Sequence, residues 1–344
     1  MRIFSLLLLA IFFSACVKDK PQEPIKTYAT INSDNSVLII NEGNYGWNNA
    51  SISIYDANTN NFVQDYYKQQ NNNQSLGDVC QSIKSFNNKY YVIVNNSSKI
   101  EVLNKSNFTK SATIFGFTSP RYILPISYSK AYVTEYYANN IKVIDLNTNS
   151  ITGNIPCNGW GDQMAVIYNK AFITNPKSNY CYIINTTNDL ITDSIIVGKG
   201  ASSIIIDKNS KVWVLSSGNS SSNQNGMLSR INPINLQIET SLTFSTGDSP
   251  NNLCDNKTHD TLYFLNKNNI YQFPISASAL PGNALINGGS KLFYGLGVSP
   301  KDYKIYVSDA IDYVQRSKIE TYDTQGNFKN SFIAGVISNG FVFE

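Results

Sequence analysis

A short strand pattern with an aromatic or large apolar residue at its second position recurs along the whole chain. The recurrences read VLIIN, YYVIV, AYVTE, AFITN, VWVLS, LYFLN and IYVSD. Their second residues, 40 to 53 residues apart, are Leu38, Tyr91, Tyr132, Phe172, Trp213, Tyr263 and Tyr306. Each recurrence is followed by an alternating strand pattern and then by a further one. A unit of about 40 to 45 residues with four short strands is the period of a β-propeller blade.

Seven such units predict an all-β fold, a seven-bladed β-propeller of four-stranded antiparallel blades over residues 32–344. The first unit has no strand pattern before Val37 to serve as its innermost strand, whereas the C-terminal segment ISNGFVFE has one to spare. We therefore predict that the C-terminal strand completes the first blade and closes the ring. Closure would remove the free sheet edges that an open array exposes.

The N-terminal segment is typical of a lipoprotein leader rather than of the fold. It has one charge, an apolar run from Ile3 to Phe13, and small residues before Cys16. The run is shorter than the roughly 20 residues that span a bilayer, and FSAC resembles a lipobox. We expect a signal peptide over residues 1–15, then a lipidated Cys16 within a flexible tether over residues 16–31. An ordinary secretory signal with an incidental Cys is the alternative.

The composition disfavours several classes of function. The net charge of +3 is too small and scattered for an electrostatic nucleic-acid binder. The single histidine, His259, lies in the turn-like stretch DNKTHD, which disfavours catalytic triads and histidine-based zinc sites. Cys80, Cys157, Cys181 and Cys254 form no C-x-x-C pair, and whether Cys157 and Cys181 form a disulfide stays open. We predict no catalytic residue, no metal and no cofactor.

The candidate site lies on loops that open on one face of the propeller. Loops between second and third strands share that face with the connections between blades, and a rigid scaffold positions both. Residues 41–49, NEGNYGWNN, are far more than a turn between paired strands needs. Aromatics among amides form a platform for a large, partly apolar ligand, unless Tyr45 and Trp47 fold back onto their own blade. The predicted ligand-binding residues are Glu42, Tyr45, Trp47, Asn49, Arg121, Tyr136, Tyr137, Trp160, Asp162 and Tyr313.

Five carboxylates accompany these residues on the same loops: Glu42, Glu135, Asp162, Asp309 and Asp312. They are spread over separate loops and lack the alternating spacing of a calcium-binding loop. The pattern favours a solvated rim over an acid–base pair or a calcium site.

Three stretches together resemble a known family. NEGNYGWNNASISIYD, KAYVTEYYANNIKVIDLNTN and the lipobox are similar to those of the YncE-like seven-bladed propeller lipoproteins of Bacteroidota, from about Ser36 onward. The most specific element is N-E-G-x-x-G-x-N-N-A-S-I over residues 41–52. The best-understood function in that group is capture of cobalamin at the cell surface and its transfer to a TonB-dependent outer-membrane transporter. Other relatives have no settled function.

The resemblance implies a non-catalytic protein, anchored in the outer membrane by its lipid and facing the cell exterior, that binds cobalamin and partners such a transporter. A neutral, Asn-rich and aromatic surface suits the carboxamide rim and apolar face of a corrinoid, and it would suit a glycan nearly as well. A glycan- or protein-binding scaffold or adhesion module therefore stays open. So does a quinoprotein-like or lactonase-like enzyme, which would show a central ring of carboxylates or a metal. A periplasm-facing anchor also stays open, because only Asp19 is acidic close to Cys16.

Overall fold

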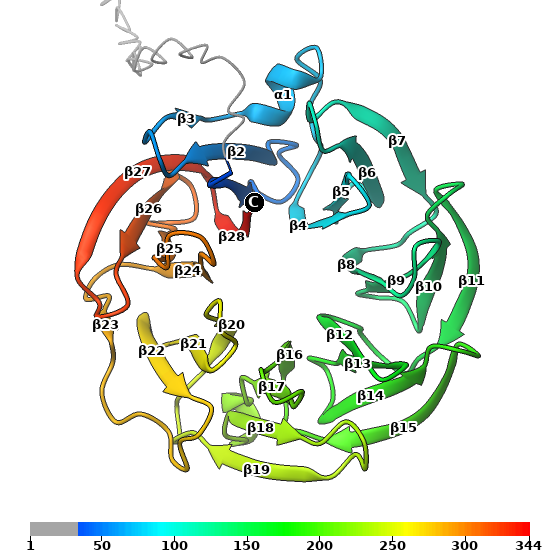
Figure 1. The fold of residues 1–344 in the computed structure, drawn as a ribbon, viewed down its shortest axis with the longest axis vertical. Coiled ribbons are helices and arrows are strands. Elements are labelled where there is room, and N and C mark those ends of the chain that lie inside the picture. Colours follow the sequence, from blue (N-terminus) through cyan, green and yellow to red (C-terminus); the bar gives the residue numbers. More distant parts are fainter. Residues whose placement is uncertain (1–33) are drawn as a thin grey trace, which may run out of the picture.

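The computed structural model describes residues 34–344, which form a closed ring of seven antiparallel sheets with four strands each (Figure 1). The predicted all-β, seven-bladed propeller is confirmed. The signal peptide, Cys16 and the tether predicted over residues 1–31 lie outside the described residues. Within residues 34–344, no helix has the length and apolar character of a membrane span.

From the axis of the ring outward, the four strands of each blade are arranged in the following order. The first blade consists of β28 (Ser338–Phe343), β1 (Ser36–Asn41), β2 (Ser51–Asp56) and β3 (Phe62–Val63). The second blade consists of β4 (Cys80–Phe86), β5 (Lys89–Val94), β6 (Lys99–Asn104) and β7 (Lys110–Phe115). The third blade consists of β8 (Pro120–Pro125), β9 (Lys130–Glu135), β10 (Asn140–Asp145) and β11 (Ser150–Pro156). The fourth blade consists of β12 (Met164–Ile167), β13 (Lys170–Thr174), β14 (Tyr180–Asn185) and β15 (Leu190–Ile196). The fifth blade consists of β16 (Ala201–Ile206), β17 (Val212–Ser216), β18 (Met227–Ile231) and β19 (Ile238–Thr243). The sixth blade consists of β20 (Asn251–Asp255), β21 (Thr261–Asn266), β22 (Asn269–Pro274) and β23 (Ile286–Asn287). The seventh blade consists of β24 (Phe293–Val298), β25 (Ile305–Asp309), β26 (Arg316–Tyr322) and β27 (Phe328–Val336).

The hydrophobic core is divided among the interfaces between blades. Buried apolar side chains of the described chain form seven clusters, and each cluster is shared by two neighbouring blades. The recurring sequence markers all lie on the second strand of a blade and are at most 1% exposed: Leu38, Tyr91, Tyr132, Phe172, Trp213, Tyr263 and Tyr306. These markers are therefore core residues. Because side chains alternate along a strand, one strand supplies both flanking interfaces.

The C-terminal strand closes the ring as predicted. β28 pairs with β1, with Val37 opposite Phe343 and Ile39 opposite Phe341. The rings of Phe341 and Phe343 lie 5.8 and 5.3 Å from the ring of Tyr306 in the seventh blade. The closing strand thus completes one sheet and packs against its neighbour.

One short helix lies in the connection between the first and second blades. Helix α1 (Tyr66–Gln70) lies between β3 and β4, at the edge of the ring (Figure 1). Asp65 caps its first turn by accepting a hydrogen bond from the backbone N–H of Lys68, and Tyr66 and Tyr67 are buried. A second short element, the 3₁₀ helix Ser220–Ser222, lies in the loop between β17 and β18.

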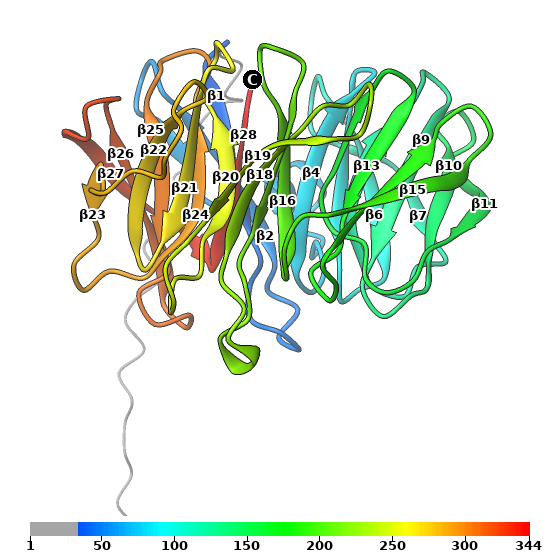
Figure 2. The same ribbon diagram turned by 90° about the horizontal axis from the view of Figure 1, so that it is seen from below.

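The two faces of the ring differ in their loops. The loops between second and third strands and the connections between blades open on one face, which we call the front face. In Figure 2 this face points down, and the loops between β1 and β2 and between β17 and β18 project from it. The opposite, back face holds the chain end, where the backbone N–H of Glu344 donates to Ser36.

Candidate functional site

A β-bulge lies at the front end of most innermost strands. In six of the seven blades formed by residues 34–344, the pairing register between the first two strands shifts there. A bulge leaves a residue outside the ladder and re-aims its side chain. The polar residues at these positions are Gln81, Arg121, Tyr122, Ser202, Asn252, Tyr294 and Asn339. The bulges therefore place a set of mostly neutral polar residues around the axis at the front face.

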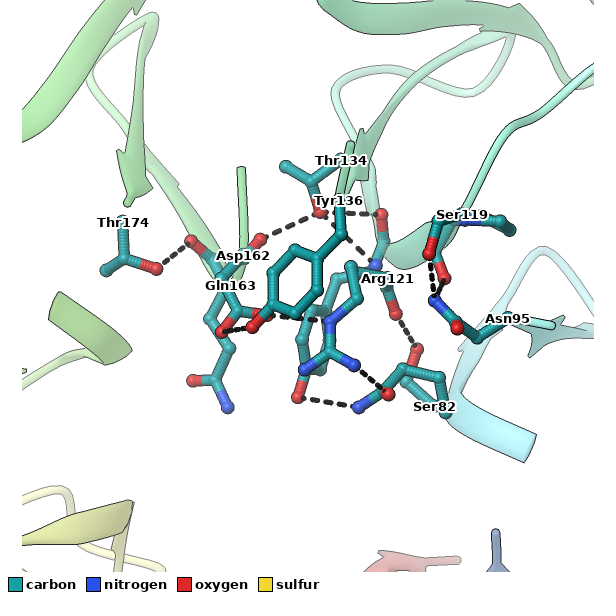
Figure 3. A network of polar contacts seen from close by, with 12 residues as sticks. Ser82, Asn95, Ser119, Arg121, Thr134, Tyr136, Asp162, Gln163 and Thr174 are labelled. Carbon is teal, nitrogen blue, oxygen red and sulfur yellow. Dashed lines mark hydrogen bonds and ion pairs between the residues drawn. The ribbon is translucent and has the colours of Figure 1, made fainter. Parts of the chain in front are cut away.

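Arg121 is the centre of a polar network between the second, third and fourth blades (Figure 3). Its Nε lies 3.2 Å from Oδ1 of Asp162, and its Nη1 donates to the side-chain oxygen of Gln81. The Tyr136 hydroxyl donates to the other Asp162 oxygen at 3.1 Å, and Thr134 donates to the Asp162 carbonyl at 2.8 Å. Burial raises the pKa of the Asp162 carboxyl, and the charge of Arg121 opposes that rise.

The same arginine begins a stack of aromatic and cationic groups. Its guanidinium carbon lies 4.0 Å from the ring centroid of Tyr136, which stacks on Trp160 at 4.6 Å and 29°. Tyr137 meets Trp160 edge-on at 4.7 Å, and the Lys177 Nζ lies 4.1 Å from the Trp160 ring. Each such contact contributes about 0.5–1.5 kcal/mol beyond burial. We call Arg121, Tyr136, Tyr137, Trp160 and Lys177 the aromatic stack, a preformed wall that joins two blades.

Glu42 lies in a second group around the axis, formed by the first and seventh blades. Its two carboxylate oxygens accept hydrogen bonds from the Tyr294 hydroxyl at 3.1 Å and from the Asn339 amide at 2.8 Å. Burial raises the pKa of Glu42, while these two hydrogen bonds and the charge of Arg121 act in the opposite direction. Tyr294 also meets Tyr313 edge-on at 5.7 Å. Both carboxyl groups near the axis, Glu42 and Asp162, are thus already hydrogen-bonded within the protein.

An exposed apolar patch lies beside this second group. Tyr45 and Trp47 are 77% and 70% exposed, and neither has a ring contact within residues 34–344. The alternative that they fold back onto their own blade is wrong. Ile311, Tyr313 and Val314, on the neighbouring loop, are also exposed. We call Tyr45, Trp47, Ile311, Tyr313 and Val314 the apolar patch.

The loop that carries Tyr45 and Trp47 is braced from within. Asn49 accepts a hydrogen bond from the backbone N–H of Asn44 at 2.8 Å and returns one to its side chain at 3.2 Å. Asn44 also donates to the Tyr313 carbonyl at 2.7 Å, which ties the loop to the seventh blade. At Gly43, with φ of 75°, a Cβ would lie 2.5 Å from the Asn49 side-chain oxygen. Asn49, predicted as a ligand contact, therefore uses its side chain to hold the loop.

The interpretation of the front-face carboxylates as a solvated rim is wrong for Glu135 and Asp162. Glu42 and Asp309 are half-buried and hydrogen-bonded within the protein. Asp312 is exposed, but Asp162 is 3% exposed and Glu135 is fully buried. Glu135 accepts hydrogen bonds from the backbone N–H groups of Thr118 and Ser119, in the connection that enters its own blade. Polar residues three positions after the sequence marker bind the corresponding connection in other blades: Asn41, Asn175, Ser216, Asn266 and Asp309. Glu135 belongs to this repeated structural clasp.

The structure thus sorts the predicted residues into two groups rather than one. It brings together Arg121, Tyr136, Tyr137, Trp160 and Asp162, and it places Glu42, Tyr45, Trp47, Asn49 and Tyr313 on the first and seventh blades. The sequence reasoning missed Gln81, Tyr122, Gln163, Lys177, Tyr294 and Asn339. Five of them share one signal, a polar residue at the front end of an otherwise apolar inner strand. Lys177 lacks this signal and was missed because its loop carries no aromatic residue.

The remaining reactive side chains do not gather at this face. No group of three or more His, Cys, Asp or Glu in residues 34–344 is arranged to hold a metal ion. Cys80, Cys157, Cys181 and Cys254 are free thiols, so Cys157 and Cys181 do not pair. His259 is exposed on the back face, with Nδ1 2.5 Å from the Asp255 carboxylate.

Comparison of the sequence with models of known protein families assigns the chain to one family. Residues 35–332 match the family described as a domain of unknown function, DUF5074. The chain belongs to the DUF5074 family. No protein of curated function matches the sequence. Family membership therefore leaves the YncE-like resemblance and the ligand as predictions.

Solved structures share the propeller fold with this DUF5074 member at low sequence identity. A quinonprotein alcohol dehydrogenase-like protein from Bacteroides thetaiotaomicron is 14% identical, covers 90% of this chain and 78% of its own, and superimposes with a TM-score of 0.72. A functionally unknown protein from Desulfotomaculum acetoxidans is 13% identical over 90% and 98%, with a TM-score of 0.70. The periplasmic gluconolactonase of Pseudomonas aeruginosa is 9% identical over 90% and 99%, with a TM-score of 0.67. Because both enzymes and uncharacterised proteins have this fold, the similarity shows the fold alone.

Proposed function

We propose that this protein is a non-catalytic, lipid-anchored binding protein that captures a corrinoid, cobalamin, on its front face. The observation that carries the proposal is the aromatic stack, which lies beside the amide side chains of Gln81 and Asn339 around the axis. In this proposal the ligand then passes to a TonB-dependent transporter in the outer membrane.

The chemistry of the front face suits a large, nearly neutral ligand. A corrinoid has an apolar macrocycle face and a rim of carboxamides. The Trp160 and Tyr137 rings, at 69° to each other, offer apolar surface, and the Asn339 side-chain oxygen, which has no hydrogen-bond partner within residues 34–344, offers an acceptor to the rim. The carboxylates of Glu42 and Asp162 are already hydrogen-bonded, so the surface presents little free negative charge.

The size of the available cavity decides where such a ligand would lie. A pocket between the innermost strands β4, β8 and β12 has a volume of about 160 Å³. Pockets that enclose drug-sized ligands measure about 300–1,000 Å³, so this one is too small for a corrin ring. The macrocycle would therefore lie across the front face, between the aromatic stack and the group around Glu42.

The apolar patch is the feature that we assign to the transporter. Exposed Trp and Tyr side chains on a rigid loop are typical of the anchors of protein–protein interfaces. Trp47 and Tyr45 have the exposure and the braced loop for that role. The same patch also favours the second candidate function, a protein-binding scaffold or adhesion module without a small-molecule ligand.

The location is proposed from the N-terminal sequence. A lipidated Cys16 would hold the protein at the outer membrane, on its exterior side. Cys16→Ala should release it from the membrane fraction, and proteolysis of whole cells should digest the wild type. Protection of the wild type until the outer membrane is ruptured would place it in the periplasm and refute capture at the surface.

Titration calorimetry of the full chain in detergent tests the ligand. We expect cobalamin binding by the wild type and a loss of about 2 kcal/mol, roughly thirtyfold in affinity, for Trp160→Ala. Tyr128→Ala is the matched control, because Tyr128 is an exposed aromatic on the back face. An equal loss for Trp47→Ala would extend the ligand site over the apolar patch, as the sequence predicted. If neither cobalamin nor cobinamide binds, the corrinoid proposal is refuted and the scaffold function is favoured.

A further inference from the structure

The pocket of about 160 Å³ near the axis is lined by both polar and apolar side chains. It lies between three consecutive innermost strands, directly behind the front-face network of Arg121. Its polar lining includes Lys84, Tyr122 and Gln163, and its apolar lining includes Ile123 and Met164. The front-face site as described does not use Lys84, Ile123 or Met164, while Tyr122 joins its network through Gln81.

The hydrogen bonds of the Tyr122 hydroxyl leave its proton without an acceptor among residues 34–344. Its hydroxyl accepts from the Gln81 amide nitrogen at 3.5 Å and is also hydrogen-bonded to Gln163. The Gln163 oxygen is occupied by the backbone N–H of Ile204 at 3.2 Å, so its amide nitrogen faces the hydroxyl. A phenol has two acceptor positions and one proton. With both acceptor positions used, the Tyr122 proton remains for a ligand.

Lys84 adds a positive charge to the same pocket. Within residues 34–344, its ammonium group forms no ion pair, and the Asp162 carboxylate of the front-face network is paired with Arg121. The Lys84 side chain lines the pocket and is exposed to solvent, so its ammonium group is accessible to a ligand there. Two hydrogen-bond donors, one of them charged, therefore face a cavity whose remaining walls are largely apolar.

We propose that this pocket binds a phosphodiester monoanion. The inference rests on the proposed function and sharpens it, because cobalamin carries one phosphodiester in its nucleotide arm and cobinamide lacks that arm. Lys84 would pair with the phosphate charge, Tyr122 would donate to a phosphate oxygen, and Ile123 and Met164 would contact the carbon atoms of the arm. The volume fits a phosphodiester with part of its sugar, while the macrocycle stays on the front face.

Paired titrations of cobalamin and cobinamide test this assignment in the full chain. We expect the wild type to prefer cobalamin and Lys84→Gln to lose at least about tenfold in cobalamin affinity, the effect of one charge-assisted hydrogen bond. The cobinamide affinity should not change. Tyr122→Phe should lose less, in the same ligand-selective way. Lys170→Gln is the matched control, because Lys170 begins β13 at the back face.

The outcomes separate the pocket from the rest of the site. Equal losses for the two ligands in Lys84→Gln, or no loss for either, would overturn the phosphodiester assignment and leave corrinoid binding intact. If the wild type binds neither ligand, the proposed function fails, and the pocket is then probed with dimethyl phosphate. Broadening of its ³¹P signal by the wild type but not by Lys84→Gln would support the pocket, and no broadening would overturn it.

Discussion

The aromatic stack and the apolar patch lie on the same face and are built from the same residue types, yet their surroundings differ. In the stack, Trp160 contacts Tyr136, Tyr137 and Lys177. In the patch, Tyr45 and Trp47 are at least 70% exposed. Tyr136 and Trp160 are therefore preorganised and partly desolvated, while Tyr137 is 70% exposed but is held against Trp160. The patch residues Tyr45 and Trp47 have no ring contact in the described part of the chain and keep their apolar area for another molecule.

The difference comes from which loops meet. The stack is assembled where short loops of the third and fourth blades converge, so that each ring fills the space beside the next. The patch lies on two loops, and the one that carries Tyr45 and Trp47 is long, is braced by Asn49 and projects from the front face. Preorganisation lowers the entropy cost of binding, which suits capture of a ligand. An exposed rigid loop suits docking of a protein.

Removal of residues 338–344 should have the largest effect and should strike the patch side of the molecule first. It deletes β28, leaves the edge of β1 unpaired and uncovers Tyr306. Because the Asn44–Tyr313 hydrogen bond joins the two blades at this seam, the patch should be lost with it. We expect a melting temperature lower by more than about 10 °C, measured by calorimetry. An unchanged, equally cooperative transition would contradict ring closure.

Arg121→Ala should have the next largest effect, on the stack side. It leaves the Asp162 carboxylate buried without its partner, which typically lowers the free energy of unfolding by about 3–5 kcal/mol. Urea unfolding would measure it. Adding Asp162→Asn should recover much of the loss, because the uncompensated charge is removed. If the double variant is no more stable than Arg121→Ala, the buried charge is not the cause.

The same variant has a predictable pH dependence. Burial raises the native pKa of Asp162 above its ordinary value of 3.8, and loss of Arg121 should raise that pKa further. A carboxyl with a raised native pKa stabilises the fold below its unfolded pKa, and this contribution is lost as pH rises through the native pKa. The deficit of Arg121→Ala should therefore shrink as the pH falls from 7 toward 4. A deficit independent of pH would contradict this.

Glu42→Gln should have a smaller effect, at the group that separates stack and patch. Because burial raises the native pKa of Glu42 above 4.5, its contribution to stability is present below pH 4.5 and is lost as the pH rises. The glutamine amide of the variant does not titrate, so the variant does not lose stability in this way as the pH rises. We expect the variant to lie within about 1 kcal/mol of wild type at pH 4 and to gain relative stability toward pH 7 in urea unfolding. A relative loss toward pH 7 would mean that the carboxylate is stabilised by its partners.

Trp47→Ala should have the smallest effect on stability, within about 0.5 kcal/mol, because the side chain is exposed. Trp160→Ala is the matched comparison and should cost more, since it removes contacts with Tyr136, Tyr137 and Lys177. Equal costs in urea unfolding would erase the distinction between patch and stack.

Part of the candidate site was predictable. The front-face loops and the aromatics Tyr136, Tyr137 and Trp160 follow from the order of strands and loops. The roles of Asn49 and Glu135 did not, because an exposed-looking amide or carboxylate in a loop sequence does not reveal which backbone groups it will satisfy. Tyr294 and Asn339 were missed for a different reason: they lie in inner strands, and a bulge rather than the alternating pattern sets their direction.

The sequence by itself determined the number of blades, the core position on each second strand and the closing role of ISNGFVFE. These properties repeat locally, since each unit needs its own buried stripe and its own four strands. Only the tertiary structure decided that Arg121, Tyr136, Trp160 and Lys177 form one stack and that Tyr45 and Trp47 stay outside it. Those contacts join different blades, so they depend on the packing angle between sheets and on bulges at their inner ends. Neither quantity is written in the periodicity of a single blade.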